Sequence, residues 1–210
     1  MAVVRRPPPT RTPRPQFHTF SAGKRLVRIF NPQPFNTTAT TFRFFGPLER
    51  FDHQRRQDNK AGIDSERGIY YAAETLSCCI VEIFGDSRVV ECGNYHVAMP
   101  KLIRDIRLLD LRGNSAMRAG TLSAVTSVPS RRLTQRWSRY FYENSVYESC
   151  DGVIYHNAHN GEEAIALYER TQNALRCQPS DITKLDDPGL RLYLIEIAER
   201  SNLVFLSGRG

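Results

Sequence analysis

The chain has 210 residues, of which 40 % are hydrophobic and 24 % are charged, and its formal net charge is +7. This length and apolar content suffice for one sizeable domain with a packed core. No stretch approaches the roughly 20 continuous apolar residues that a membrane-spanning helix requires, and the basic N-terminus lacks the apolar segment of a secretory signal. We therefore expect a cytoplasmic protein without a membrane association.

The positive charge is concentrated in the first quarter of the chain. Residues 1–48 contain eight Lys or Arg and no acidic residue, whereas the remaining residues carry 21 basic and 22 acidic side chains. A nucleic-acid-binding face would extend further along the fold, so we expect no direct contact with nucleic acid. A local basic entrance instead suits a ligand or partner that carries phosphate.

Residues 1–20 are predicted to form a flexible tail rich in proline and arginine, and residues 21–210 to form a single domain. The first 17 residues hold five prolines and four arginines, a composition that cannot bury a core and favours an extended chain. Contact with acidic partners and a solvated leader without a role both remain open for this tail.

Short apolar, aromatic and alternating runs predict strands over residues 26–30, 40–45, 68–73, 88–92, 95–99, 106–111, 152–155 and 191–197. Helices are predicted over residues 75–84, 131–143 and 161–175, with Gly85 ending the first as a left-handed cap residue. This irregular order predicts an α+β fold with mixed, mostly antiparallel sheets and about three helices. The sequence lacks the glycine patterns of Rossmann and P-loop nucleotide sites.

The cysteines and histidines do not form a metal-ligand pattern. Five cysteines cannot all pair within one chain, and none is spaced as CxxC, so we expect reduced thiols rather than disulfides or a zinc cluster. His156 and His159 stand three residues apart without an obvious third ligand. We therefore predict a polar loop there and no metal site.

Two charged positions are unusual for their predicted elements. Arg28 lies in the middle of a strand and shares one face with apolar neighbours, so its guanidinium needs an anion or access to water. Glu82 borders the apolar stripe of the first predicted helix, on the same edge as Cys78 and Cys79. Its carboxylate lies either at the solvent boundary or in a cleft, and the periodicity leaves both open.

Two adjacent tyrosines occupy the strand predicted over residues 68–73. Tyr70 and Tyr71 must point to opposite faces of that strand. One is expected to pack in the core, and the other to offer a ring for stacking and a hydroxyl for hydrogen bonding. The pattern leaves open which tyrosine has which role.

Five short motifs together resemble the RES domain family over roughly residues 24–206. They are LVRI at 26–29, ERFD at 49–52, GIYYA at 68–72, VE at 81–82 and GVIYHN at 152–157. The resemblance implies a fold like that of ADP-ribosyltransferases. It also implies an activity on NAD, because many members are toxins of bacterial toxin–antitoxin pairs that degrade it. Their usual partner is a helical, DNA-binding antitoxin that blocks the active site.

By position, the resemblance implies that Arg28 and Arg50 bind NAD, that Tyr70 is the active-site tyrosine and that Glu82 is the acidic catalytic residue. The family's serine falls on Asn157 in this chain, which places an amide where a hydroxyl is usual. We therefore group Asn157 with the catalytic positions.

Two functions follow from these expectations. The first is an NAD-consuming enzyme that cleaves the nicotinamide–ribose bond, with NAD as substrate rather than cofactor and with water, phosphate or a protein as acceptor. The second is a catalytically weakened RES-fold protein that binds a nucleotide or a partner. A homo-oligomer is compatible with both.

Overall fold

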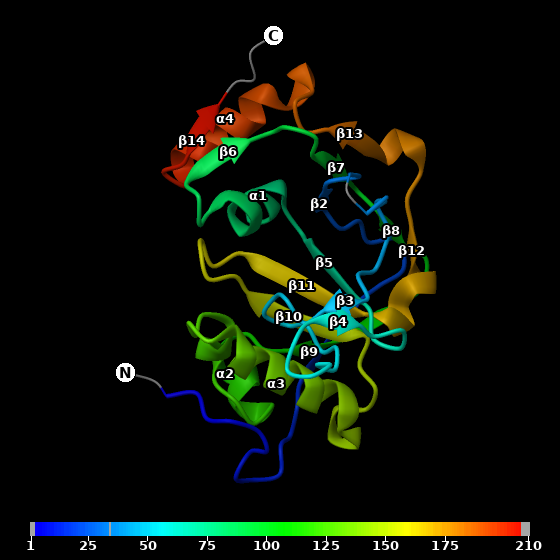
Figure 1. Ribbon diagram of the computed structural model, residues 1–210, viewed down its shortest axis with the longest axis vertical. Helices are drawn as coiled ribbons and strands as arrows, with labels where there is room; N and C mark the ends of the chain where they lie inside the picture. The colour runs from blue at the N-terminus through cyan, green and yellow to red at the C-terminus, as the bar shows by residue number, and fades with distance from the viewer. Residues whose placement is uncertain (1–2, 34, 207–210) are drawn as a thin grey trace.

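A five-stranded sheet forms the centre of the computed structural model, which describes residues 3–33 and 35–206 (Figure 1). Its strand order is β1–β9–β10–β11–β5. The bounds are β1 (Phe17–Phe20), β9 (Ile106–Asp110), β10 (Gly152–His156), β11 (Glu163–Tyr168) and β5 (Ile69–Ala73). Within this sheet β9 and β10 run parallel, and the other neighbours run antiparallel.

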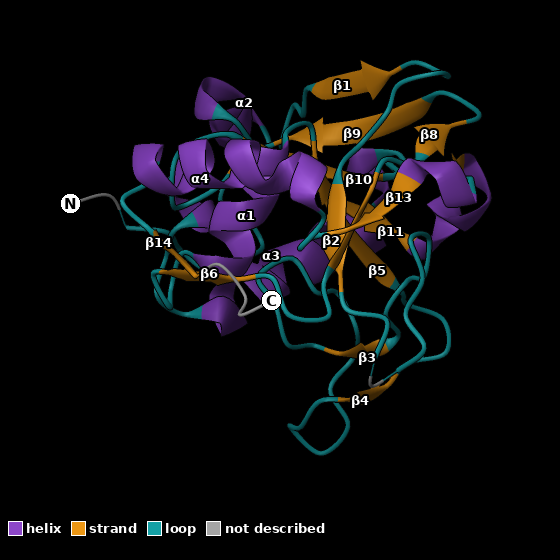
Figure 2. Cartoon of the chain, turned by 90° about the horizontal axis from the view of Figure 1, so that it is seen from above, coloured by secondary structure: helices purple, strands orange, loops and turns teal. Residues whose placement is uncertain are grey.

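Smaller sheets surround the central one. β13 (Ile182–Lys184), β7 (His96–Ala98) and β2 (Arg28–Phe30) form a three-stranded sheet. The two-stranded sheets are β12 (Leu175–Arg176) with β8 (Lys101–Leu102), β14 (Val204–Leu206) with β6 (Val89–Glu91), and β3 (Phe45–Gly46) with β4 (Gly62–Ile63). The β3–β4 hairpin projects away from the central sheet (Figure 2).

Four α-helices accompany these sheets in the described part of the chain: α1 (Leu76–Phe84), α2 (Gly113–Arg118), α3 (Arg131–Glu143) and α4 (Arg191–Arg200). Short 3₁₀ segments are η1 (Ser123–Thr126), η2 (Ser145–Tyr147), η3 (Glu169–Ala174), η4 (Pro179–Asp181) and η5 (Pro188–Leu190). None of the helices among the described residues has the length and apolar character needed to cross a bilayer.

Helix α1 lies between the central sheet and the layer of β6, β14 and α4 (Figure 1). The hydroxyl of Thr75 accepts a hydrogen bond from the Cys78 amide and so caps the first turn. The buried side of α1 packs against β2, β5 and β11. This arrangement holds the helix, and with it Glu82, over one face of β5.

The central sheet is buried on both faces. One face joins a large core that includes Val153, Tyr155 and the aromatic side chains of α3. The other face, with Tyr70 and Ile154, packs under the segments that carry Leu26, Phe42, Leu102 and Leu175. The predicted α+β fold with mostly antiparallel sheets is confirmed, since among the described pairings β9–β10 and β6–β14 run parallel and the rest antiparallel.

Two predicted elements have the wrong type. The helix predicted over 161–175 is strand β11 followed by η3. β11 has neighbours on both sides and apolar contacts on both faces, which removes the alternation by which a strand is recognised. The strand predicted over 191–197 is helix α4, because Leu194 and Ala198, four residues apart, are its buried positions.

The predicted role of Gly85 is also wrong. Its φ of −61° is right-handed helical, so the position does not need the left-handed freedom of glycine. A Cβ at Gly85 would instead clash with the Val81 carbonyl oxygen and would lie 2.6 Å from Nδ1 of His159. Glycine is therefore required by the close approach of the Val81 carbonyl and of the His159 ring.

The predicted boundary between tail and domain differs from the structure. Phe17–Phe20 forms strand β1 and pairs antiparallel with β9, with the Phe17 ring 3.6 Å from the Arg107 guanidinium carbon. Further upstream, the Arg14 amide donates a hydrogen bond to the Arg118 carbonyl at 2.8 Å. The domain thus begins before residue 21, because aromatic residues 17 and 20 complete the sheet edge. Residues 1–2 and 207–210 of the predicted tail and domain lie outside the described residues.

Candidate active site

A pocket of about 550 Å³ lies between α1, β5 and the segment that carries Arg50. We call it the Glu82 pocket. Its charged and polar lining residues are Glu49, Arg50, Tyr71, Glu82, Asp86, Arg131, Tyr155 and His159, and its apolar ones include Ile29, Ala73 and Ile83. A neighbouring hollow of about 630 Å³ shares Asp86, Ala158 and His159 with it. A cavity of this volume with both apolar and polar walls is typical of small-ligand sites.

Glu82 reaches the pocket from α1. Glu82 is exposed to water, but desolvation by the surrounding protein raises the pKa of its carboxyl, while the nearby Arg50 guanidinium opposes that rise. Glu82 therefore lines a cleft and is also open to solvent. A carboxylate in such surroundings is strongly attracted to a positive charge that develops beside it.

Arg50 also lines the pocket. Its Nη1 donates a hydrogen bond to the Val128 carbonyl at 2.5 Å, which fixes the guanidinium in place. A guanidinium has five N–H donors, so the rest of the group can bind an anionic ligand. Beside it, Glu49 pairs with Arg131 at 2.9 Å.

Asp52 is the buried anchor beneath this segment, and in the sequence it stands out only as the last residue of the ERFD motif. The wholly buried carboxylate accepts hydrogen bonds from Arg43 at 2.9 Å, from the Leu48 amide at 2.5 Å and from the Glu49 amide at 2.9 Å. It also accepts one from the Tyr71 hydroxyl at 2.8 Å. Asp52 therefore ties the loop that carries Arg50 to the tyrosine of the pocket.

Tyr71 rather than Tyr70 lines the pocket. The Tyr71 hydroxyl accepts from the Phe51 amide at 3.1 Å as well as donating to Asp52, and burial followed by the Asp52 charge raises its pKa well above the usual range. The phenol therefore stays neutral at physiological pH, and Tyr71 lines the cavity.

Tyr70 and Arg28 lie together on the other face of the sheet. Tyr70 is fully buried, and its hydroxyl donates to the Ala39 carbonyl at 2.8 Å. The Arg28 guanidinium stacks 4.2 Å from the Tyr70 ring centre and donates to the Thr41 carbonyl at 2.8 Å. Of the four residues to which the resemblance assigned roles in binding or cleaving NAD, Arg50 and Glu82 line the pocket, whereas Arg28 and Tyr70 do not. Strand alternation accounts for Tyr70, because it places Tyr70 and Tyr71 on opposite faces of β5.

Asn157 lies beneath the pocket wall and is nearly buried. Its Oδ1 accepts from the His159 and Asn160 amides, both at 2.9 Å. Its Nδ2 donates to the Cys78 sulfur at 3.1 Å and to the Asn160 side-chain oxygen at 2.7 Å. The amide thus joins the start of α1 to the loop that places Ala158 and His159 at the cavity.

The cysteine thiol at this site is not a reactive nucleophile. Cys78 is a free, buried cysteine, and burial raises the pKa of its thiol to about 12. Since the thiolate is the reactive form, a neutral buried thiol is inert. Within residues 3–33 and 35–206, no group of three His, Cys, Asp or Glu side chains is placed to hold a metal.

Comparison with protein families identifies the chain at this point: the model of the RES domain matches residues 25–191. The chain belongs to the RES domain family. The RES domain here is also similar in fold to a chain in the crystal structure of the M. tuberculosis MbcT-MbcA toxin-antitoxin complex. The TM-score is 0.54 at 14 % sequence identity, over 84 % of this chain and 91 % of that chain. No curated protein sequence matches this chain. The predicted family and fold are confirmed.

Proposed function

We propose that this RES domain cleaves the nicotinamide–ribose bond of NAD and acts as the toxin of a toxin–antitoxin pair. The observation that carries the proposal is the placement of Glu82, Arg50 and Tyr71 around one cavity in a chain of this family. The cavity combines a carboxylate, arginines and an aromatic ring, which are the groups that a positively charged ring joined to a pyrophosphate would need.

Glu82 is proposed as the catalytic residue. Cleavage of the bond places positive charge on the ribose, as in glycoside hydrolysis. Nicotinamide leaves as a neutral molecule, because it is cationic before the bond breaks, so a strong general acid is not required. A carboxylate held against the ribose stabilises the developing charge, and removing one such group typically costs about 10²–10³ in rate.

Arg50 and Tyr71 are proposed to bind and orient the substrate. Arg50 lines the cavity, and its N–H groups that do not bond to Val128 suit the pyrophosphate. Tyr71 offers its ring beside Glu82 and takes the role that the family resemblance implied for Tyr70. In this proposal Arg28 acts indirectly, by holding the segment around Thr41.

The first test is nicotinamide release from NAD by the purified chain. We expect release by the wild type and a loss of about 10²–10³ in Glu82→Gln. The raised pKa means that burial disfavours the charged Glu82 carboxyl, so its neutral replacement is expected to fold at least as well at neutral pH. Glu199→Gln, an exposed position on α4, is the matched control and keeps full activity. Absence of release under every acceptor condition would overturn the proposal.

The acceptor is identified by the second product. Hydrolysis yields ADP-ribose, phosphorolysis yields ADP-ribose phosphate, and transfer yields a modified protein. Incubation with water alone, with inorganic phosphate and with a cell extract distinguishes the three reactions by mass spectrometry. Each must disappear in Glu82→Gln if the same site performs it.

The proposed partner is a helical, DNA-binding antitoxin that covers the Glu82 pocket. The structural neighbour comes from a toxin–antitoxin complex, and the family resemblance implies the same kind of partner. An adjacent reading frame that encodes a helix-turn-helix protein is the candidate. Co-expression should suppress both nicotinamide release and growth arrest, and an antitoxin that binds without inhibiting would contradict coverage of the pocket.

A further inference from the structure

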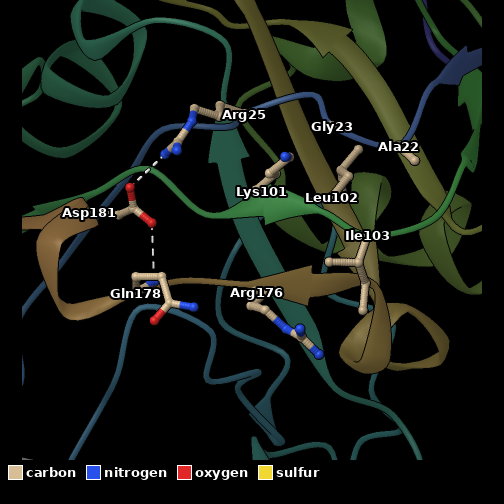
Figure 3. Close-up of a pocket in the computed structure, with 9 residues that line it drawn as sticks. All are labelled: Ala22, Gly23, Arg25, Lys101, Leu102, Ile103, Arg176, Gln178 and Asp181. Carbon is tan, nitrogen blue, oxygen red and sulfur yellow. Dashed lines mark hydrogen bonds and ion pairs between the residues drawn. The ribbon is translucent and has the colours of Figure 1, made fainter.

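A second pocket of about 550 Å³ lies beside β8 and β12 and shares no lining residue with the Glu82 pocket. We call it the basic pocket. Arg25, Lys101 and Arg176 line it together with Gly23, Ile103 and Asp181 (Figure 3). None of these residues has a role in the proposed NAD chemistry.

The three cations occupy directly opposed positions on neighbouring segments. Arg25 forms an antiparallel bridge with Lys101, and Lys101 is the register partner of Arg176 in the β8–β12 pair. Residues that oppose one another across strands project to the same face, and like charges in such pairs are destabilising. The fold therefore brings positive charges together at a cost to its own stability.

Only part of this charge is neutralised within the protein. Asp181 pairs with Arg25 at 2.6 Å, and that ion pair holds the pKa of Asp181 below its usual range. Lys24, on the alternate side of the segment, pairs with Glu74. Among the described residues, neither Lys101 nor Arg176 has an acidic partner within ion-pair distance, so the pocket retains two uncompensated positive charges.

We propose that the basic pocket binds a phosphate group. A phosphate monoester carries about −1.5 to −2 charges at pH 7, which matches the two unpaired cations. In Figure 3 the Lys101 and Arg176 side chains extend to opposite sides of the β8–β12 pair, and both are exposed. Adjacent strands lie about 4.8 Å apart, so these long side chains can turn toward one tetrahedral anion, whereas same-side carboxylates of an extended peptide recur only about every 7 Å. Ile103, nearly half exposed at 46 %, offers an apolar wall beside the anion. The phosphate comes either from free inorganic phosphate or from a nucleotide.

The test compares two doubly substituted full-length chains that lose the same charge. Lys101→Gln/Arg176→Gln removes the uncompensated pair, and Lys60→Gln/Arg191→Gln removes two exposed cations elsewhere. Melting temperature and calorimetric affinity are measured in chloride, inorganic phosphate and ADP at equal ionic strength. We expect phosphate to stabilise the wild type and the control. The site variant should lose at least about ten-fold in affinity, the scale of one charge-assisted hydrogen bond.

The same experiment checks that the variants fold and identifies the source of the phosphate. Without phosphate, Lys101→Gln/Arg176→Gln should melt at or above the wild-type temperature, because repulsion is relieved; if it does not fold, Arg176→Gln alone serves. ADP binding lost in the site variant but retained in Arg50→Gln assigns the phosphate to a nucleotide, and equal affinity for phosphate and ADP assigns it to free phosphate. The proposal fails if phosphate acts like chloride, if both double variants respond alike, or if a hexaglutamate peptide binds the pocket more tightly than either phosphate.

Discussion

In the Glu82 pocket, acidic and basic side chains face one another, whereas the basic pocket keeps an excess of positive charge. Glu49 pairs with Arg131, and Arg50 offsets the effect of burial on Glu82. Across the molecule, Lys101 and Arg176 oppose each other without an acidic partner in the described residues. A site of mixed sign suits a ligand with both charges, such as NAD, and a site of one sign suits a simple anion. The two pockets therefore differ in chemistry although their volumes are equal.

Among the residues around the Glu82 pocket, Asp52 is expected to contribute most to stability. Asp52→Asn leaves Arg43 without its bidentate partner and weakens the bonds to the Glu49 amide and the Tyr71 hydroxyl. We expect a loss of about 1.5–3 kcal/mol in the free energy of unfolding, the usual scale for hydrogen bonds to a charged group, because Arg43 is partly exposed to water. Urea unfolding measures it, with the exposed Asp58→Asn as control. An unchanged midpoint would show that Asp52 does not anchor this loop.

The adjacent tyrosines provide the next test. Tyr70→Phe leaves the Ala39 carbonyl unpaired in the core and should cost about 1–3 kcal/mol of stability with little change in kcat/KM. Tyr71→Phe should lower kcat/KM, because its hydroxyl holds Asp52 and the Phe51 amide at the pocket. Steady-state kinetics and thermal unfolding of both variants separate the roles. The reverse pattern would return the active-site role to Tyr70.

Asn157→Ser tests the idea of a weakened enzyme. Serine is shorter than asparagine and cannot replace both the bonds to the loop amides and the bond to Cys78. We expect a loss of about 1–2 kcal/mol in stability and no gain in nicotinamide release. A faster variant would favour the alternative in which Asn157 reduces activity.

The smallest expected effect is a shift of the acidic limb of the pH–rate profile. Glu82 must be ionised to stabilise the ribose cation, and burial raises its pKa, so activity should fall as the pH drops through a value above the usual glutamate range. Arg50 lowers that pKa, so Arg50→Gln should move the limb to higher pH. Rates measured between pH 4 and 8 decide the direction. A limb that stays in place would separate Arg50 from Glu82 electrostatically.

Elements with a clear hydrophobic periodicity in the sequence were predicted correctly. The helix at residues 131–143 matches α3, and the strand at 68–73 contains β5, because each has a clear periodicity. β11 was missed because burial on both faces is set by its neighbours in space rather than by its own sequence.

The same limit applies to the site. The tyrosine pair could be located but not assigned, since the choice depends on which side of β5 receives α1. Asp52 could not be recognised as an anchor, because its partners come from three separate segments of the chain. The order of the motifs nevertheless predicted the family, and that prediction is confirmed.

The N-terminal segment contacts the only tryptophan of the chain, Trp137 on α3. Its indole N–H donates to the Arg5 carbonyl at 2.8 Å, and the ring is 2 % exposed. Detachment of the first residues would open this indole to water and shift its emission to longer wavelength. The protein therefore carries an intrinsic fluorescent reporter, so the docking of its own N-terminus on a partner or on the domain can be followed without any label.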